Sequence, residues 1–472
     1  MLFFSLQFII FFAIVFLLYW NLSNIRHRKA VLLVASYVFY AAWDYRFLTL
    51  IIFSTVLDYV IGLKLESEHC QRRRKLWVTL SLVGNLGVLF FFKYFDFFIE
   101  SFSQFLALFS VEAEPLYLNI ILPIGISFYT FQTLSYTIDL YRKKIQAEKS
   151  LLNLAVFVGF FTQLTAGPIV RAADFLPQLS LTQRLSDVQW KGAVALFFIG
   201  MFKKVVVADN CAIFVDAVYA NPALYDAYSI AMATMLFSIQ MYCDFSGYSD
   251  MAIASAALLG FRFPVNFAWP YFASNVALFW NRWHISLSGW FRDYVYSTLI
   301  GLKRNQLMVS LSLLITFFLS GLWHGAGWKF IVFGIMHGVA ILLFRLFKMF
   351  KKRAGIDRKT SHPVMFVVSI AFTYLWFCTT ALFFRAEELG IAWDMMGMMF
   401  RADSNASHSI PSFIPIVWCI LVVMHWIAWR FDLIKIANNL KSPVYGVVLG
   451  VCIAIIIAGT PSNQTPFLYF QF

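Results

Sequence analysis

Two apolar runs flank a short stretch rich in glycine and tryptophan between residues 307 and 344, LMVSLSLLITFFL–SGLWHGAGWK–FIVFGIMHGVAILLF. Each flanking segment is about as long as a membrane-crossing helix, which needs roughly 17–25 mostly apolar residues. The stretch therefore places an ionisable side chain, His324, between two candidate membrane spans.

Similar apolar runs recur along the 472 residues, of which 61% are hydrophobic and 13% charged. Soluble proteins have about 25% charged residues, so this chain has too few to cover a water-facing surface. A transmembrane β-barrel would instead show alternating segments of ~10 residues. The pattern predicts an all-α, polytopic membrane protein whose candidate spans are residues 3–20, 30–43, 47–64, 76–99, 119–141, 151–168, 192–218, 228–260, 307–323, 328–348, 363–384, 412–430 and 443–460.

The basic residues predict an orientation. The net charge is +13, and much of it gathers in the short loops 26–29, 72–75, 142–144 and 348–353. Cytoplasmic loops carry an excess of Lys and Arg, so we expect these loops inside and no nucleic-acid partner. Both termini and the loops 100–118 and 385–411 are then extracytoplasmic. With no long linker and no repeat, we expect a single membrane domain over residues 1–472.

Two regions break the pattern of apolar spans. Residues 168–190 are polar and contain two prolines, so they are not expected to span. Residues 261–305 are dense in aromatic side chains but interrupted by charged residues and a histidine. Such backbone is tolerated at membrane depth only inside protein or beside a wet cavity. We expect amphipathic helices that lie at the interface or dip into a central funnel.

Neither a metal site nor a resident cofactor is expected. The six cysteines show no CxxC spacing, so a zinc site is not supported. His324 and His337 are 13 residues apart, so on one helix they would point roughly 140° from each other. One continuous helix therefore does not present both histidines to one ion.

The remaining candidates for chemistry are polar residues inside the apolar body, since the sequence lacks the usual soluble-enzyme motifs. An ionisable group within a membrane span is a functional candidate by default. Desolvation keeps a buried imidazole neutral, which makes it a ready proton acceptor. The spacings Gly321-xxx-Gly325 and Gly334-xxx-Gly338 favour close helix packing. Gly321, Gly325 and Gly327 also leave space beside His324 for another molecule, with Trp323 and Trp328 as its walls.

The second candidate, His284, lies in the stretch WNRWHISLSGWFRDY at 280–294. If this stretch is one helix, His284, Ser288 and Phe291 share a face. An interfacial helix anchored by Arg and Trp accounts for most of these residues but less well for the histidine.

These motifs resemble the membrane-bound O-acyltransferase family, in particular its branch of bacterial alginate O-acetyltransferases and related polysaccharide-modifying enzymes. RWHISLSGWFRDYVY at 282–296 and FFLSGLWHGAGWKFIVFGIMHG at 317–338 carry the resemblance. The segments LPIGISFYTFQTLSYTIDLYR, TAGPIVR, YCDFSGYSDMAIASAALLGF and the ending PFLYFQF extend it over nearly the whole chain.

The resemblance implies about eleven membrane spans around a thin centre, where funnels from both faces meet at His324, with His284 as the family's second histidine. It also implies a multi-pass protein of the bacterial inner membrane, and an extracytoplasmic polysaccharide acceptor served through a periplasmic partner related to SGNH hydrolases. We expect acetyl-CoA as the donor substrate. The residues expected to bind donor or acceptor are Trp323, Gly325, Trp328, Asn281, Ser288, Arg292, Lys303 and Arg304.

Two alternatives remain open from the sequence. A relative that transfers D-alanine to teichoic acid has a similar pattern. A proton-coupled transporter or flippase would use buried acidic residues as a relay, for which the candidates are Asp58, Asp139, Asp244 and Asp250.

Overall fold

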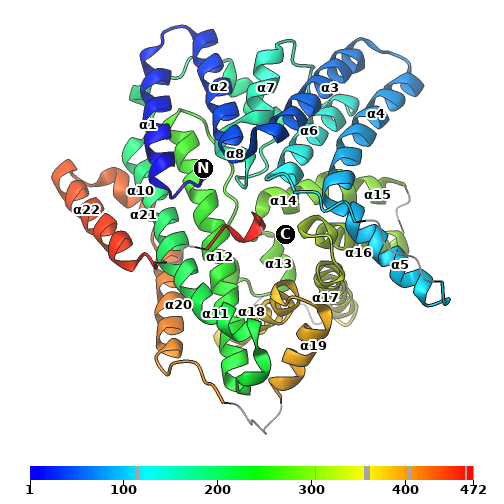
Figure 1. The fold of residues 1–472 in the computed structure, drawn as a ribbon, viewed down its shortest axis with the longest axis vertical. Helices are drawn as coiled ribbons and strands as arrows, with labels where there is room; N and C mark the ends of the chain where they lie inside the picture. Colours follow the sequence, from blue (N-terminus) through cyan, green and yellow to red (C-terminus); the bar gives the residue numbers. More distant parts are fainter. Residues whose placement is uncertain (112–116, 303–304, 356–361, 401–406, 463–464, 471–472) are drawn as a thin grey trace. The chain divides into compact units, whose positions relative to one another are not determined.

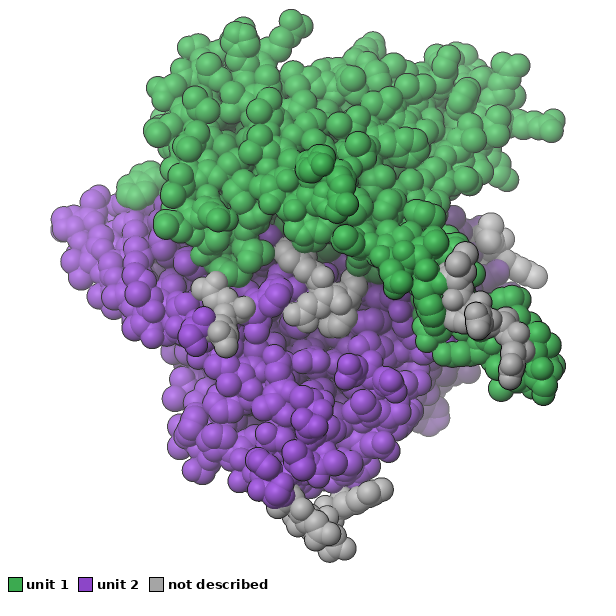
Figure 2. Space-filling model, viewed as in Figure 1, with its two compact units in different colours: residues 1–190, 252–264 green, residues 191–251, 265–472 purple. Residues whose placement is uncertain are grey.

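The computed structural model describes residues 1–472 except 112–116, 303–304, 356–361, 401–406, 463–464 and 471–472. The described residues are mainly helical, and the β-type pairing seen among them is an isolated bridge between Tyr225 and His408. The chain divides into two compact units, residues 1–190 with 252–264 and residues 191–251 with 265–472, which Figure 2 colours separately. The prediction of one domain over 1–472 stays a prediction.

The described residues of unit 1 contain the helices α1 to α9 (Figure 1). Their bounds are α1 (Leu6–Asn21), α2 (Ile25–Asp44), α3 (Leu48–Ser67), α4 (Gln71–Leu89), α5 (Phe95–Ala107), α6 (Ile126–Tyr141), α7 (Leu151–Gly159), α8 (Phe161–Leu164) and α9 (Ala172–Leu179). The expected polar region 168–190 holds α9 and the short turn η3 (Leu185–Asp187), which fits its low hydrophobicity.

Unit 2 contains most of the remaining helices, and the division between the units falls within α12. The bounds are α10 (Trp190–Met201), α11 (Asp209–Ala220), α12 (Ala227–Leu258), α13 (Val276–Trp280), α14 (Ile285–Trp290), α15 (Ser297–Leu302), α16 (Gln306–His324), α17 (Trp328–Arg353), α18 (Pro363–Arg385), α19 (Leu389–Met398), α20 (Ile414–Arg430), α21 (Leu433–Asn439) and α22 (Ser442–Gly459). Shorter turns are the π-helical η4 (Phe202–Ala208) and η7 (Phe291–Tyr296), and the 3₁₀ turn η8 (Leu468–Phe470).

Each apolar run predicted from the sequence contains a helix, which confirms the all-α membrane fold. By length and composition, six described helical segments are suited to cross a membrane, or seven if the bent pair α20–α21 counts as one span. The expected number of about eleven spans is not confirmed by this count. The protein is nevertheless a multi-pass membrane protein, because several apolar, membrane-length helices follow one another along the chain.

The quoted stretch forms a tight helical hairpin, α16 and α17. The Asn305 side chain caps the start of α16 by accepting from the backbone N–H of Met308. Gly321 and Gly334 bring the two helices close together: a Cβ at residue 334 would lie 2.9 Å from the Gly321 Cα and 2.3 Å from the Phe317 carbonyl oxygen. The helix-packing reading of these glycines is therefore confirmed.

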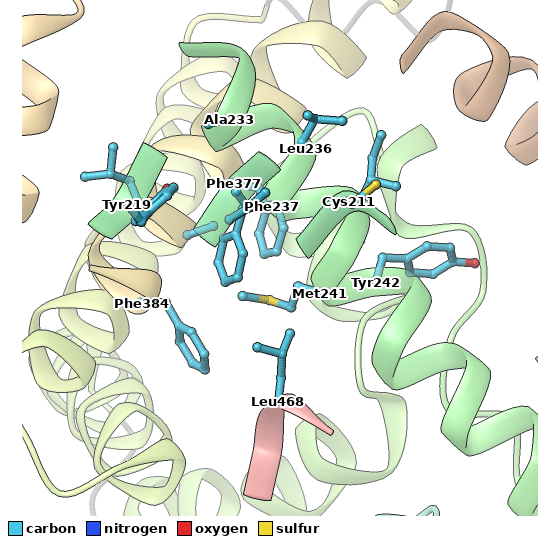
Figure 3. Close-up of a cluster of buried hydrophobic side chains, with 14 of the residues drawn as sticks. Cys211, Tyr219, Ala233, Leu236, Phe237, Met241, Tyr242, Phe377, Phe384 and Leu468 are labelled. Carbon is cyan, nitrogen blue, oxygen red and sulfur yellow. The ribbon is translucent and has the colours of Figure 1, made fainter. Parts of the chain in front are cut away.

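The core of unit 2 is a cluster of buried apolar side chains from α11, α12, α18 and neighbouring segments (Figure 3). Phe237 and Met241 of α12 contribute to it, as do Phe377 and Phe384 of α18. Leu468, near the end of the chain, points into this cluster toward Met241. The burial of these large side chains stabilises the packing of α12, α18 and Leu468 against one another within unit 2.

Candidate active site

His324 is the last residue of α16 and is buried, with 4% of its surface exposed. Its Nδ1 lies 3.1 Å from the Tyr469 hydroxyl, a hydrogen-bonding distance. The rings of Phe333 and Phe384 lie roughly perpendicular to the imidazole, with ring centroids 5.8 and 5.4 Å away. Aromatic rings thus line the imidazole, and the expected funnels stay a prediction.

His284 is fully buried and stands directly before α14 in a left-handed conformation, with φ of 42° and ψ of 56°. Asn266 holds this turn, since its carbonyl oxygen accepts from the N–H of Ile285 and its side-chain oxygen from the hydroxyl of Ser286. A left-handed residue other than glycine costs roughly 1–2 kcal/mol, and such strain gathers at functional sites. The backbone thus fixes the place of this histidine.

The expected shared helix face of His284, Ser288 and Phe291 is wrong. The first helix of this stretch, α13, ends at Trp280, and α14 begins at Ile285, so His284 lies outside any helix. The described part of residues 261–305 contains the short helices α13, α14 and α15, and the expectation that they lie at the interface or dip into a funnel stays a prediction.

The two histidines share two aromatic neighbours within unit 2. The Trp323 ring lies 5.1 Å from the His324 ring and 5.8 Å from the His284 ring. The Tyr469 ring lies 5.6 Å from His324 and 6.3 Å from His284. Phe245 of α12 lies 4.5 Å from both His284 and Tyr469. The site is therefore a histidine pair whose rings both lie beside Trp323 and Tyr469, with further aromatic side chains around each histidine.

The sequence had suggested both histidines and Trp323, but it assigned no role to Tyr469 or Phe245. Tyr469 lies in the ending PFLYFQF, which shared in the family resemblance. The sequence did contain one signal for Tyr469. This residue carries a hydroxyl within a mostly apolar ending, and a tyrosine hydroxyl in apolar surroundings usually has a hydrogen-bond partner. The partner itself, 145 residues away, was not visible in the sequence.

The other predicted binding residues are placed as follows. Trp328 is 54% exposed at the start of α17, and Asn281 is exposed at the end of α13. The Ser288 hydroxyl donates to the Trp283 carbonyl oxygen at 3.1 Å. Arg292 is paired with its neighbour Asp293 at 2.8 Å. Lys303 and Arg304 lie outside the described residues, and the binding roles of all these residues stay predictions.

The expected open space beside the glycines is occupied by the chain itself. A Cβ at Gly325 would lie 2.1 Å from the Phe330 ring, and a Cβ at Gly321 would meet the Phe330 carbonyl oxygen. These two glycines therefore let α17 approach His324 closely, and the expectation that they leave room for another molecule is wrong in this structure.

Within the described part of the chain, no group of three or more His, Cys, Asp or Glu side chains is arranged to hold a metal ion. His337 is also buried, and its Nε2 lies 3.0 Å from the Thr380 hydroxyl. The Phe333 ring lies next to both His324 and His337, at 5.8 and 4.7 Å. His337 is thus a hydrogen-bonded core histidine.

These features define a multi-pass helical membrane protein with a buried histidine pair in its second unit. The model of MBOAT, the membrane-bound O-acyltransferase family, matches residues 3–385. The chain therefore belongs to the membrane-bound O-acyltransferase family, and its activity is that of an O-acyltransferase.

Curated relatives support the same class of enzyme. The chain is 40% identical to a "Probable alginate O-acetylase AlgI" of Azotobacter vinelandii over 85% of this chain and 78% of the relative. It is 35% identical to a "Peptidoglycan O-acetyltransferase" of Helicobacter pylori over 76% and 71% of the two chains. It is 29% identical to a "Teichoic acid D-alanyltransferase" of Streptococcus thermophilus over 56% and 67%.

Proposed function

We propose that this O-acyltransferase takes an acetyl group from acetyl-CoA on the cytoplasmic side and passes it to a hydroxyl on the other side of the membrane. The acceptor is an extracytoplasmic, alginate-like polysaccharide or a periplasmic protein that acetylates it. The observation that carries the proposal is His324, buried at the end of α16 and hydrogen-bonded through Nδ1 to Tyr469. The relatives named for O-acetyl transfer to alginate and peptidoglycan support this acyl group and a carbohydrate polymer.

His324 acts as the general base in this proposal. The acceptor oxygen attacks the thioester carbonyl carbon, its proton passes to the imidazole, and the C–S bond breaks to release the thiolate of CoA. The proton then moves from the imidazolium to the thiolate, so no further reactant is needed. This role requires the tautomer in which Nδ1–H donates to the Tyr469 oxygen and Nε2 carries the lone pair.

His284 orients the donor or acceptor beside His324, because the two rings share Trp323 and Tyr469 as neighbours. Arg292, whose side chain is largely exposed, is proposed to meet the CoA phosphates together with Lys303 and Arg304. Arginine binds phosphate through paired N–H donors, so phosphate would compete with Asp293 for the Arg292 guanidinium.

The proposed setting is the bacterial inner membrane, with both termini extracytoplasmic. The acetyl donor is charged and stays in the cytoplasm, whereas the polymer lies outside. The reaction therefore needs a catalytic site within the membrane that both substrates reach. A periplasmic partner related to SGNH hydrolases would dock on loops 100–118 and 385–411. Residues 112–116 and 401–406 of these loops lie outside the described residues.

Two other functions find less support. D-Alanyl transfer is supported by a relative that matches about half of this chain, less than the O-acetylase and O-acetyltransferase relatives match. A proton relay is disfavoured because Asp250 and Asp244 pair with Lys203 and Lys204 at 2.7 Å. Side chains held in ion pairs serve poorly as a relay.

The proposal is tested with purified protein in liposomes, supplied in parallel with labelled acetyl-CoA and with a D-alanyl carrier protein. We expect label to move from acetyl-CoA to a soluble oligosaccharide or to the partner protein. Transfer from the D-alanyl carrier alone would show that the acyl group is wrong. Proton-driven transport without acyl transfer would show that the class of reaction is wrong.

Tyr469→Phe tests the hydrogen bond at His324. The substitution keeps the ring between Phe245 and His324 but removes the hydroxyl that selects the imidazole tautomer. We expect kcat to fall about tenfold, the rate equivalent of one hydrogen bond, with KM for acetyl-CoA nearly unchanged. Steady-state rates measure this, and an unchanged kcat would show that Tyr469 does not influence the reacting imidazole.

A further inference from the structure

Three buried charged residues, Lys204, Asp209 and Asp244, form a cluster beside Thr465, which precedes Tyr469 in the sequence. The Lys204 ammonium is 2.7 Å from a carboxylate oxygen of Asp209 and 2.7 Å from one of Asp244. The three side chains are at most 2% exposed. Buried charges are tolerated only when they are paired and fully hydrogen-bonded, and here two carboxylates face one ammonium. The cluster therefore needs further donors to stabilise its second negative charge.

Those donors come from the last described residues of the chain, which we call the 465–470 segment. The Thr465 hydroxyl donates to Asp209 at 2.6 Å, and the Leu468 backbone N–H donates to Asp244 at 2.9 Å. In return, Lys204 donates to the Thr465 carbonyl oxygen at 2.9 Å. Hydrogen bonds to ionised groups are the strong ones, so the segment is held at both Thr465 and Leu468.

Apolar packing also holds the segment, through the side chains of Phe467 and Leu468. Phe467 is fully buried and stacks on Tyr248 of α12 with ring centroids 4.6 Å apart. The Leu468 side chain enters the core cluster beside Met241 (Figure 3). Both contacts use the same helix that carries Asp244, so α12 receives the backbone and the side chains of the segment together.

Tyr469 follows directly after the anchored Leu468. Its ring packs on Phe245, the residue next to Asp244 on α12, with centroids 4.5 Å apart. Phe245 also contacts His284 at 4.5 Å, and the Tyr469 hydroxyl reaches Nδ1 of His324. Two neighbouring residues of α12 therefore have complementary contacts. Asp244 binds the backbone of the segment, and Phe245 packs against both Tyr469 and His284.

We propose that Lys204, Asp209 and Asp244 are positioning residues that clasp the 465–470 segment and thereby place the Tyr469 hydroxyl on His324. This inference rests on the acyl-transfer role of His324 proposed above. The three residues act on the reaction through Tyr469 and do not touch the substrate. The segment lies beyond residue 385, where the match to the family model ends, so the clasp joins this segment to the part of the chain that the family model covers.

The test uses Asp244→Asn and the pair Thr465→Val and Thr465→Ser in the full-length protein. An amide has a single acceptor oxygen, so an asparagine side chain in place of Asp244 would not serve Lys204 and Leu468 on its two sides. Valine keeps the shape of Thr465 but removes its hydroxyl, whereas serine retains that hydroxyl. The matched control is Asp250→Asn. Asp250 lies on α12, as Asp244 does, and this substitution breaks its ion pair with Lys203.

A photo-cross-linking experiment measures the position of residue 469 independently of activity. A photoreactive p-azidophenylalanine replaces Tyr469, the purified protein is illuminated, and cross-links to the peptide that contains Trp323 and His324 are quantified by mass spectrometry. We expect Asp244→Asn and Thr465→Val to lower this yield, because each removes a hydrogen bond to a charged group that holds the segment in place. Thr465→Ser and Asp250→Asn should stay near the parent.

Kinetics supply the second readout, on chains that keep Tyr469. Asp244→Asn and Thr465→Val should lower kcat about tenfold with KM nearly unchanged, and Thr465→Ser should restore it. Unchanged cross-linking and kcat in both variants would overturn the clasp, as would an equal loss in Asp250→Asn. If no chain transfers acetyl but cross-linking still depends on the cluster, the positioning is supported and the acetyl-transfer proposal fails.

Discussion

His324→Gln is expected to lower kcat for acetyl transfer by about 10²–10⁴, the range that a general base contributes. Glutamine is neutral and close to histidine in size, but its amide does not take up a proton at neutral pH. The helix α16 and its packing against α17 remain, because the substitution lies at the last residue of the helix. The loss is therefore expected in the chemical step and not in folding.

His337→Gln provides the matched control for this prediction. His337 is also a buried histidine of unit 2, but its ring is hydrogen-bonded to Thr380 and is separated from His324 by the Phe333 ring. We expect its kcat to stay within a few-fold of the parent. Equal losses in the two variants would indicate general damage to the core, and a His324→Gln enzyme of parental kcat would refute the general-base role.

Gly334→Ala is expected to destabilise the protein by about 1–3 kcal/mol, the usual cost of overpacking a close contact. The added methyl group would lie 2.3 Å from the Phe317 carbonyl oxygen and 2.9 Å from the Gly321 Cα. Backbone atoms do not move aside as side chains do, so α16 and α17 must separate. Because His324 ends α16, activity should fall together with stability.

Thermal unfolding in detergent, followed by tryptophan fluorescence, measures this effect. Gly450→Ala is the control, since a Cβ at that position of α22 meets nothing within 4 Å. There the substitution should be neutral or slightly stabilising, because alanine has the higher helix propensity. A Gly334→Ala protein as stable as Gly450→Ala would show that the two helices do not need their close approach.

The all-α architecture was predictable because it depends on hydrophobic runs, which are local in sequence. Each predicted run contains a helix, although bounds shifted by several residues and the run at 151–168 divides into α7 and α8. The run at 119–141, for example, begins its helix at Ile126, after the left-handed Gly125. Local hydrophobicity does not reveal such turns, nor does it decide how many helices cross the membrane.

The candidate site was predictable in part. His284, Trp323 and His324 were found from their unusual place in apolar surroundings, and the structure brings them together. Tyr469 and the Lys204 cluster were missed, because their roles depend on contacts between residues more than a hundred positions apart. The space beside Gly325 was misjudged for a different reason, because the ring of Phe330, a near neighbour in sequence, fills it after α17 folds back.

The central claim is that His324 catalyses acetyl transfer through the membrane. The most direct measurement uses sealed vesicles with labelled acetyl-CoA on the cytoplasmic face and acceptor on the other, and compares parent protein with His324→Gln. The account predicts labelled acceptor on the far side with the parent and a rate at least about a hundredfold lower with the variant. Equal labelling by the two proteins, or labelled acceptor on the donor side alone, would contradict it.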